Sequence, residues 1–336
     1  MNRSWNISFK STLLTGFMVV VSMYYYAQDF HLSQYEASPM ILNPAMTGQF
    51  KGDHRATMHY RSQWSSIISN PFKSMALSYD TKFNKFSLGG YLHHTTAGQG
   101  TYTSITMVLS AAYDYKFKNK PHNHLVGGLQ LGGINKSVNF NVLTFEDQYD
   151  PANGGTFTNS TAESFGVGST FIPEVNFGLM YYYTNTSKRI NPFLGISGMH
   201  LTQPNETLFS SNSKLPMRIN VHPGIKVFIS DRFSFLIDGL AMQQENILEL
   251  VFGWKGYYHF ENKDAIASYG VSRRTNNDAI IAHLGLKYNK FLYKLSYDLN
   301  TSNLQSISNN RGGFELSITY ISSKINPIPI RTCPDL

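Results

Sequence analysis

The sequence has 336 residues, of which 14% are aromatic and 15% are charged, and its mean hydropathy is −0.24. Water-soluble domains usually carry about 25% charged residues, and helical membrane proteins contain long uninterrupted apolar segments, so the composition fits neither class. It fits an all-β chain with one face toward lipid and one polar face. The formal charge of +7 is scattered without a block of Lys or Arg, so we expect no nucleic-acid partner.

Residues 1–27 have the pattern of a signal peptide. Arg3 and Lys10 precede an apolar stretch from residue 13 to 23, and Ala27 supplies a small residue at the end. The apolar stretch is shorter than the roughly 20 residues that a spanning helix needs. We therefore expect this segment to direct export and then to be removed.

The segment that follows, residues 28–53, is predicted to be an N-terminal arm or plug. Pro39 and Pro44 remove backbone donors, and Asn43-Pro44 followed by Gly48 is typical of a turn, so the segment is unsuited to a membrane strand. It combines apolar residues with few charges, and a free tail of this kind would expose apolar surface.

We expect this arm to fold against the lumen or the periplasmic mouth of a barrel. Ser33, Gln34 and Asn43 are expected to hydrogen-bond to inward-facing polar residues, and Tyr35 is expected to pack at the rim. A disordered periplasmic leader is the alternative.

Beyond the arm, fourteen segments alternate with period two and have turn residues at both ends. They span residues 54–63, 73–80, 86–94, 102–116, 124–136, 171–184, 191–201, 217–230, 232–243, 246–260, 265–273, 278–288, 290–300 and 313–321. This pattern predicts an all-β fold, a transmembrane antiparallel β-barrel of about fourteen strands. The barrel would occupy residues 54–322, with a periplasmic tail at 323–336.

The alternation is clearest near the C-terminus. One face carries Phe291, Tyr293, Leu295, Tyr297 and Leu299, and polar residues lie between them. Such a face also suits the core of a sandwich. The barrel is favoured because the segments reach the roughly 9–11 residues that a tilted membrane strand needs and because aromatic residues cluster near their ends.

The predicted connections differ in length between the two ends of the barrel. One end has short polar turns, such as residues 82–85 and 289–290, and the other has longer segments, such as residues 137–170 and 202–216. Outer-membrane barrels have short periplasmic turns and long external loops. We therefore expect an outer-membrane location with both termini in the periplasm.

Residues that could carry out chemistry are scattered. His93 and His94 point to opposite faces of a strand, and His122 and His124 share a face but have no Cys or carboxylate cluster nearby. Ser, His and Asp are all present, but no nucleophile motif accompanies them. We expect no enzyme activity, no catalytic residue, no metal and no cofactor. The single cysteine, Cys333, excludes an intramolecular disulfide.

Several motifs occur in order along the chain. They are Gln28-x-x-x-Leu32-Ser33-Gln34-Tyr35, Asn43-Pro44-Ala45-x-x-Gly48, Tyr60-Arg61-x-Gln63-Trp64, Thr144-Phe145-x-Asp147-Gln148, His200-Leu201-Thr202-Gln203-Pro204-Asn205, Lys214-Leu215-Pro216 and Ser296-Tyr297-Asp298-Leu299. In these motifs the sequence resembles the PorP/SprF family of outer-membrane proteins, which serves type IX secretion and gliding motility. The candidate interaction residues are Ser33, Gln34, Tyr35, Asn43, Pro44, Gly48, Arg61, Trp64, Asp147, Gln148, His200, Thr202, Gln203, Pro204 and Asn205.

The resemblance implies a barrel that binds secreted partner proteins and supports their export or surface anchoring. The implied partners are type IX secretion or gliding components, the C-terminal domain of a secreted surface protein, and outer-membrane lipids. The long segment 140–170, with Tyr149, Phe157 and Phe165, is the candidate contact loop, unless it is an ordinary mobile loop. The alternative function is an outer-membrane channel or porin for small solutes.

Overall fold

The structure is a computed structural model of the chain. It describes residues 29–65, 71–98, 101–162, 168–185, 187–208, 213–261, 264–275, 278–302 and 305–322. The chain divides into two units after Phe30, and only residues 29 and 30 of the first unit are described. The predicted signal peptide and the predicted tail lie outside the described residues. The description below concerns the unit that starts at His31.

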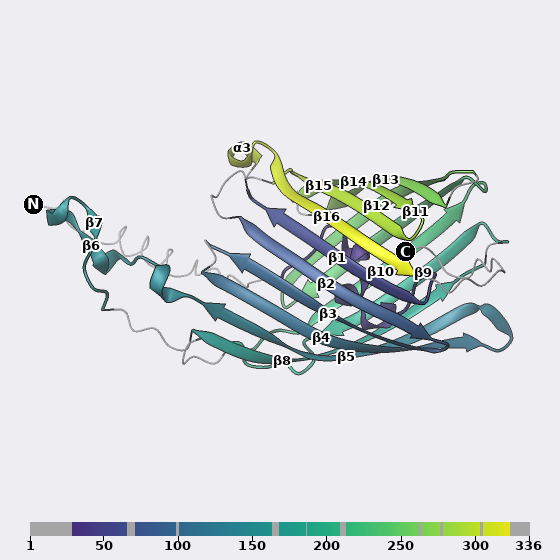
Figure 1. Ribbon diagram of the computed structural model, residues 1–336, viewed down its shortest axis with the longest axis horizontal. Helices are drawn as coiled ribbons and strands as arrows, with labels where there is room; N and C mark the ends of the chain where they lie inside the picture. The colour runs from purple at the N-terminus through teal and green to yellow at the C-terminus, as the bar shows by residue number, and fades with distance from the viewer. Residues whose placement is uncertain are drawn as a thin grey trace, which may run out of the picture. The chain divides into compact units, whose positions relative to one another are not determined.

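Long antiparallel strands form the wall of the molecule. They are β1 (His54–Gln63), β2 (Phe72–Phe83), β3 (Phe86–Ala97), β4 (Tyr102–Phe117), β5 (Lys120–Val138), β8 (Ser169–Tyr183), β9 (Ile190–Met199), β10 (Arg218–Phe228), β11 (Phe233–Gln244), β12 (Ile247–His259), β13 (Ala265–Arg274), β14 (Ala279–Tyr288), β15 (Phe291–Asn300) and β16 (Arg311–Ser322). Within the described residues these fourteen strands form one closed barrel, in chain order around the ring (Figure 1). The predicted fold class is confirmed.

The ring closes where the last strand pairs with the first. His54 lies opposite Ser322 and Arg61 lies opposite Glu315 in the β1–β16 register. A closed ring has no free strand edge, so the backbone donors and acceptors of the wall find partners without water. Closure therefore makes the wall compatible with a membrane.

Side chains alternate between the two faces of the wall. Phe252 and Leu295 are 60% and 43% exposed on the outer face, whereas the neighbouring Glu249 and Lys255 are buried on the inner face. This is the period-two alternation that the sequence predicted, most clearly for β15. The outer face offers an apolar surface to lipid, and the inner face forms a polar lumen.

The two ends of the barrel have different connections. One end, here called the short-turn end, has the connections 84–85, 118–119, 184–189, 229–232, 260–264 and 289–290. The other end, here called the long-loop end, has the connections 64–71, 98–101, 139–168, 200–217, 245–246, 275–278 and 301–310. The predicted difference is present in the connections 64–71, 139–168, 200–217 and 301–310, whereas 98–101, 245–246 and 275–278 are as short as turns of the short-turn end.

Short elements complete the described chain. They are η1 (Tyr35–Ala37), α2 (Pro39–Leu42) and η2 (Pro44–Met46) before the wall, η3 (Phe140–Val142), η4 (Glu146–Gln148), β6 (Tyr149–Asp150), η5 (Pro151–Asn153) and β7 (Thr156–Phe157) between β5 and β8, and α3 (Gln305–Ser308) before β16. Among the described residues, no helix has the length and apolar character needed to cross a membrane. The helical turns of the arm were not predicted.

Residues 31–53, here called the arm, lie inside the ring of strands. Ser33 hydrogen-bonds to β16, Tyr35 to β11, and Gly48 to β2. β16 and β2 both flank β1, but β11 lies farther around the ring, so a single segment reaches all three strands through the lumen. Figure 1 shows the arm, in purple, behind β1 and β2.

Candidate functional site: the arm in the lumen

Two prolines shape the arm locally. Pro39 begins α2 and Pro44 begins η2, positions where a fixed φ is favourable and a missing N–H costs nothing. Asn43 caps η2, because its Oδ1 accepts a 2.8 Å hydrogen bond from the Ala45 N–H. Gly48 then turns the chain with φ +73°, where a Cβ would lie 2.0 Å from Ser87 Oγ. The predicted turn after Asn43-Pro44 is therefore built from a capped helical turn and a left-handed glycine.

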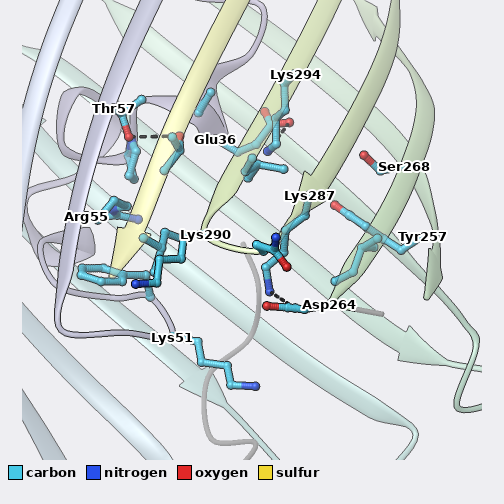
Figure 2. Close-up of a pocket in the computed structure, with 18 of the residues that line it drawn as sticks. Glu36, Lys51, Arg55, Thr57, Tyr257, Asp264, Ser268, Lys287, Lys290 and Lys294 are labelled. Atoms are coloured by element: carbon cyan, nitrogen blue, oxygen red, sulfur yellow. Dashed lines mark hydrogen bonds and ion pairs between the residues drawn. The ribbon is translucent and has the colours of Figure 1, made fainter. Parts of the chain in front are cut away.

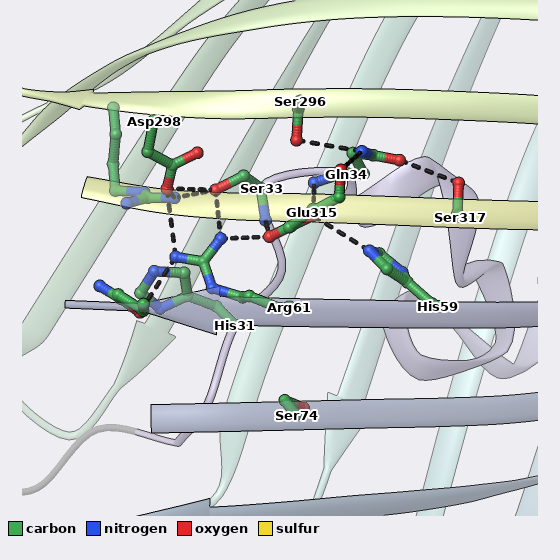
Figure 3. Close-up of polar contacts among 12 residues, drawn as sticks. His31, Ser33, Gln34, His59, Arg61, Ser74, Ser296, Asp298, Glu315 and Ser317 are labelled. Carbon is green, nitrogen blue, oxygen red and sulfur yellow. Dashed lines mark hydrogen bonds and ion pairs between the residues drawn. The ribbon is translucent and has the colours of Figure 1, made fainter. Parts of the chain in front are cut away.

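The carboxylate of Glu315, on the inner face of β16, holds the start of the arm (Figure 3). The backbone N–H groups of Ser33 and Gln34 donate to its two oxygens at 2.7 and 2.8 Å. Arg61 forms an ion pair with the same carboxylate, and His59 Nε2 lies 3.1 Å from it. Glu315 is fully buried, so these contacts are shielded from water and screened little by salt. We call this set of contacts the Glu315 anchor.

A second carboxylate extends the anchor. The Ser33 hydroxyl donates to Asp298 Oδ2 at 2.7 Å and accepts from Arg61 and Arg274, each at 2.7 Å. Arg61 also donates to Asp298 at 3.1 Å. One small hydroxyl of the arm is thus hydrogen-bonded to three charged groups of the wall, and breaking a buried pair by removing one partner typically costs about 3–5 kcal/mol.

The Gln34 side chain has partners for both of its ends. Its amide nitrogen donates to Ser296 Oγ at 3.0 Å and to the backbone oxygen of Glu315 at 3.2 Å. Its amide oxygen accepts from Ser317 Oγ at 2.9 Å. The amide is therefore matched to two serines of neighbouring strands, and its fit depends on the register of β15 against β16.

Tyr35 lies within the lumen and not at the rim, so that expectation was wrong. It is 7% exposed, and its hydroxyl donates to Asp238, in the middle of β11. Lys255 lies 2.8 Å from Asp238 and 3.4 Å from Glu36 of the arm. Burial would raise the pKa of Glu36, but Lys255 and Lys294 lower this pKa to about 2. Glu36 is therefore a buried carboxylate that remains charged.

The second part of the arm meets the wall mainly through its backbone. Ser197 and Asn220 donate to the Leu42 carbonyl at 2.7 and 3.1 Å. Asn43 Nδ2 lies 2.9 Å from His222 Nε2 and donates to the Leu179 carbonyl at 3.2 Å. These bonds satisfy polar groups that would otherwise be buried without partners.

Glycines of β5 and β8 make room for this part of the arm. A Cβ at Gly128 would lie 2.3 Å from the carbonyl carbon of Pro44, and a Cβ at Gly178 would lie 2.0 Å from Asn43 Oδ1. The missing side chains of these glycines let the arm backbone approach the wall.

An apolar cluster lies beside these glycines. Leu42 and Met46 of the arm pack in one buried cluster with Val126, Met180 and Tyr182 of the wall. Each fully buried apolar side chain of this size contributes roughly 1.5–3 kcal/mol relative to exposure. This part of the arm is therefore held by apolar burial as well as by hydrogen bonds.

The arm joins the wall near the short-turn end. The Gly48 N–H donates to Asp80 Oδ2 at 2.7 Å, and Arg55 bonds the same carboxylate at 2.6 and 2.9 Å. Arg55 also donates to the Met46 carbonyl at 3.3 Å. A two-point Arg–carboxylate contact has a defined geometry, so it orients the chain where the arm leaves the lumen.

The remaining candidate residues lie away from the arm, in the connections of the long-loop end. Trp64 packs edge-on against Phe72 at the end of β1. Asp147 accepts from the Thr161 hydroxyl and the Ala162 N–H, and Gln148 accepts from the Phe145 N–H. Each of these contacts joins residues that are close in sequence, which is what a loop needs to order itself.

The His200–Asn205 motif forms a turn after β9. His200 has φ +57° and its Nδ1 lies 2.7 Å from Glu174, while the Gln203 N–H donates to the His200 carbonyl at 3.0 Å. The Pro204 carbonyl accepts from the Leu215 N–H at 2.8 Å, Asn205 forms a bridge with Lys214, and Thr202 is exposed. The structure therefore separates the predicted candidates into arm residues, the wall residue Arg61 that binds the arm, and loop residues.

The structure reveals binding residues that were not among the predicted candidates. They are His59, Asp238, His222, Arg274, Asp298 and Glu315. All lie on inner faces of strands, and Asp298 and Glu315 alternate there with outward apolar residues of β15 and β16. A charged residue on a predicted lumen face was the signal that could have drawn attention to them.

One contact chain resembles a hydrolytic triad in its residue types. Ser38 Oγ lies 2.9 Å from His59 Nδ1, and His59 Nε2 lies 3.1 Å from Glu315. Ser38 is only 3% exposed and Glu315 is committed to Arg61 and to the arm backbone, so a substrate carbonyl has no access. Within the described ranges, no group of three or more His, Cys, Asp or Glu residues could hold a metal ion.

Comparison with known proteins agrees with this architecture. The profile of the family described as type IX secretion system membrane protein PorP/SprF matches residues 25–320. No curated protein matches the sequence.

Three solved structures are among those to which the chain shows similarity. The toluene transporter TodX of P. putida is 10% identical (TM-score 0.46; 86% of this chain, 94% of that chain). A FadL homologue of Pseudomonas aeruginosa is 12% identical (TM-score 0.47; 84% and 94%), and the porin NanC is 8% identical (TM-score 0.41; 80% and 100%). At these identities nothing is carried over about ligands. The family match covers most of the sequence, and the chain belongs to the PorP/SprF family of type IX secretion system membrane proteins.

Proposed function

We propose that this outer-membrane barrel is a non-enzymatic part of the type IX secretion and gliding machinery that binds secreted proteins. It supports their export or their anchoring at the cell surface. Its partners would be components of the machinery and the C-terminal domain of a secreted surface protein. In this proposal residues 28–53 act as a plug and residues 54–322 act as the barrel that carries it.

The observation that carries the proposal is the arm held in the lumen by the Glu315 anchor. An open channel for small solutes needs a free lumen, whereas here the described arm would first have to leave several buried charged contacts. An occupied lumen suits a barrel that acts through recognition at its ends and loops. This favours a binding role over the alternative of a channel or porin.

The unequal ends support an orientation. Short periplasmic turns and long external loops are the usual arrangement in outer-membrane barrels, so the short-turn end would face the periplasm. The wall begins at His54 and ends at Ser322, both at this end. The outer apolar face would then contact outer-membrane lipids.

The connection between β5 and β8 would lie outside and supply a contact surface for a partner. Within it, Tyr149 and Phe157 belong to the paired β6 and β7, with ring centroids 5.4 Å apart, and both are exposed. Exposed aromatic residues on a small ordered hairpin are typical of recognition surfaces. Phe165, the third aromatic of this predicted loop, lies outside the described residues.

The absence of catalysis in this proposal is supported by the burial of the ionisable groups. Glu315, Asp298 and Arg61 are each engaged by fixed partners in the lumen. Such groups stabilise a docked segment well, but they offer no open position for a reacting substrate.

Proteomics of the secreted and surface fractions tests this function. Deletion of the protein should remove one or a few surface proteins, and the variant Glu315→Gln, in which the arm is loosened, should reduce the same proteins. Glu261→Gln, which breaks the exposed pair with Arg232, is the matched control and should secrete normally. An unchanged surface proteome after deletion would contradict the proposal.

Conductance in planar bilayers tests the channel alternative. The intact protein should show little steady conductance, and a protein lacking residues 31–48 should show more, because the lumen loses its described occupant. A large, steady conductance of the intact protein would favour the channel.

A further inference from the structure

A cavity of about 300 Å³ lies at the short-turn end, between the arm and the wall (Figure 2). Its lining cations are Lys51, Arg55, Lys226, Lys287, Lys290 and Lys294. Its lining carboxylates are Glu36 and Asp264. Cations therefore outnumber carboxylates by six to two. A concave surface lined mainly by one sign of charge concentrates the field and attracts ligands of the opposite sign.

The carboxylates of the cavity already have cationic partners. Glu36 lies 3.4 Å from Lys255 and 3.8 Å from Lys294, and Asp264 lies 3.4 Å from Lys287. By contrast, Lys51 and Lys290 have no ion-pair partner in the part of the chain that the structure describes. Both are exposed, so their ammonium groups are available at the opening.

Apolar side chains line the same cavity. Phe50, Ile266 and Leu292 contribute to its wall, and the ring of Tyr257 lies 5.1 Å from the Lys226 ammonium. A volume of about 300 Å³ is at the lower limit of small-ligand pockets. The combination of apolar wall and ammonium groups suits a short segment that carries both carboxylates and carbon-rich side chains.

The position of the cavity indicates the source of such a ligand. Arg55, Thr57 and Thr319 belong to the inner face of β1 and β16, so the cavity is on the lumen side of the wall. Bilayer lipid covers the outer face. A polypeptide in the aqueous phase can enter from the short-turn end, whereas a bilayer lipid is separated from the cavity by the wall.

We infer that this cavity is a docking site for an acidic, extended peptide segment of a protein partner. The carboxylates of the segment would pair with Lys51 and Lys290 at the opening. This site is distinct from the Glu315 anchor and goes beyond the proposed role in export. Its test needs only the purified protein.

Fluorescence anisotropy with the full chain in detergent provides the test, and the probe is a fluorescein-labelled penta-glutamate peptide. The double variant Lys51→Ala/Lys290→Ala should bind this peptide about tenfold more weakly or worse, because it removes two charge-assisted contacts. Lys51 lies at the exposed end of the arm and Lys290 lies in the exposed turn 289–290, so the barrel should still fold and show heat-modifiable migration.

The matched control is Lys85→Ala/Lys118→Ala. It removes the same charge from exposed turns of the same end, but neither residue lines the cavity. The control should bind within about twofold of the unmodified protein. A penta-glutamine peptide should not bind.

Three outcomes would overturn the inference. One is the absence of penta-glutamate binding by the unmodified protein. Another is an equal loss in the two double variants, which would indicate a general charge effect of the rim. The third is displacement of the penta-glutamate peptide by inorganic phosphate at the same concentration as the peptide, which would indicate a small-anion site.

Discussion

Residues 31–38 of the arm are held by buried charges of β1, β11, β12, β13, β15 and β16, whereas residues 39–46 are held mainly by close fit against β5, β8, β9 and β10. We call them the anchor half and the fitted half. The anchor half depends on the exact charge of a few wall residues, because a buried charge without its partner is costly. Docking of the fitted half depends on small residues in the wall, because the wall there leaves space for the arm backbone and not for larger wall side chains. The same arm is therefore sensitive to electrostatic changes at one end and to steric changes at the other.

The largest loss of docking free energy is expected from Glu315→Gln. The amide keeps the shape of the carboxylate but removes the charge that Arg61 faces, so docking of the anchor half should weaken by about 3–5 kcal/mol. Limited proteolysis in detergent should then cut the anchor half near Tyr35 much faster, while the barrel keeps its heat-modifiable migration.

Glu261→Gln is the control for this charge effect. Its pair with Arg232 is exposed, with side chains 63% and 51% accessible, and such a pair contributes less than about 1 kcal/mol. Equal protection of the arm in the two variants would contradict the role given to the Glu315 anchor.

The next largest effect is expected from Gly128→Ala. The added methyl group would overlap the Pro44 backbone, and overpacking of this kind costs about 1–3 kcal/mol. Hydrogen exchange should rise in the fitted half more than in the anchor half. The neighbouring Gly127→Ala is the control, because its Cβ would meet only Leu179 at an ordinary 3.7 Å. If Gly128→Ala and Gly127→Ala change hydrogen exchange of the arm equally, Gly128 does not provide space for the arm.

A pH-dependent effect is expected in the anchor half. Burial is the main cause that lowers the pKa of His31 well below 6.5, and Arg274 and Arg61 lower it further. The released arm therefore binds a proton more readily than the docked arm. Docking should be full above pH 6.5 and should weaken as the pH falls below it, by at most about 1.4 kcal/mol per pH unit.

Proteolysis rates of the arm between pH 7.5 and 5.5 measure this effect. His31→Gln removes the titrating group, so its rates should depend less on pH than those of the unmodified protein. The same slope in both proteins would assign the pH dependence to other groups.

The smallest effect is expected from Ser317→Ala. It removes one neutral hydrogen bond to Gln34 and leaves the Glu315 anchor in place, so docking should weaken by about 1 kcal/mol. Thr319→Val is the control, because its hydroxyl bonds Thr57 and not the arm. If Ser317→Ala weakens docking as much as Glu315→Gln does, charge is not the main contribution to the docking of the anchor half.

Most of the wall could be predicted from the sequence because its signals are local. Every predicted strand exists, and β1 has the predicted bounds 54–63, since alternation and turn residues are encoded by neighbouring positions. Deviations are at strand ends, as in β5, which begins at Lys120 and not at His124. Inside a closed ring, pairing with neighbours extends a strand past the point where its own alternation stops.

The type of contact that the arm makes could be predicted, but its individual partners could not. Prolines and turn residues excluded a strand, and Ser33, Gln34 and Asn43 do hydrogen-bond to lumen side chains. Their individual partners depend on contacts between positions far apart in the sequence, such as Ser33 with Glu315. Tyr35 was misplaced for this reason, since only the three-dimensional path of the arm brings it to Asp238.

The Glu315 anchor spans the seam at which the barrel closes. Arg61 belongs to the first strand and Glu315 to the last, and they lie opposite each other in the β1–β16 register. The arm precedes both strands in the chain, yet its main acceptor is made only when the final strand is in place. Docking of the anchor half therefore has to wait for the last strand, and a docked anchor half is the sign of a completed barrel.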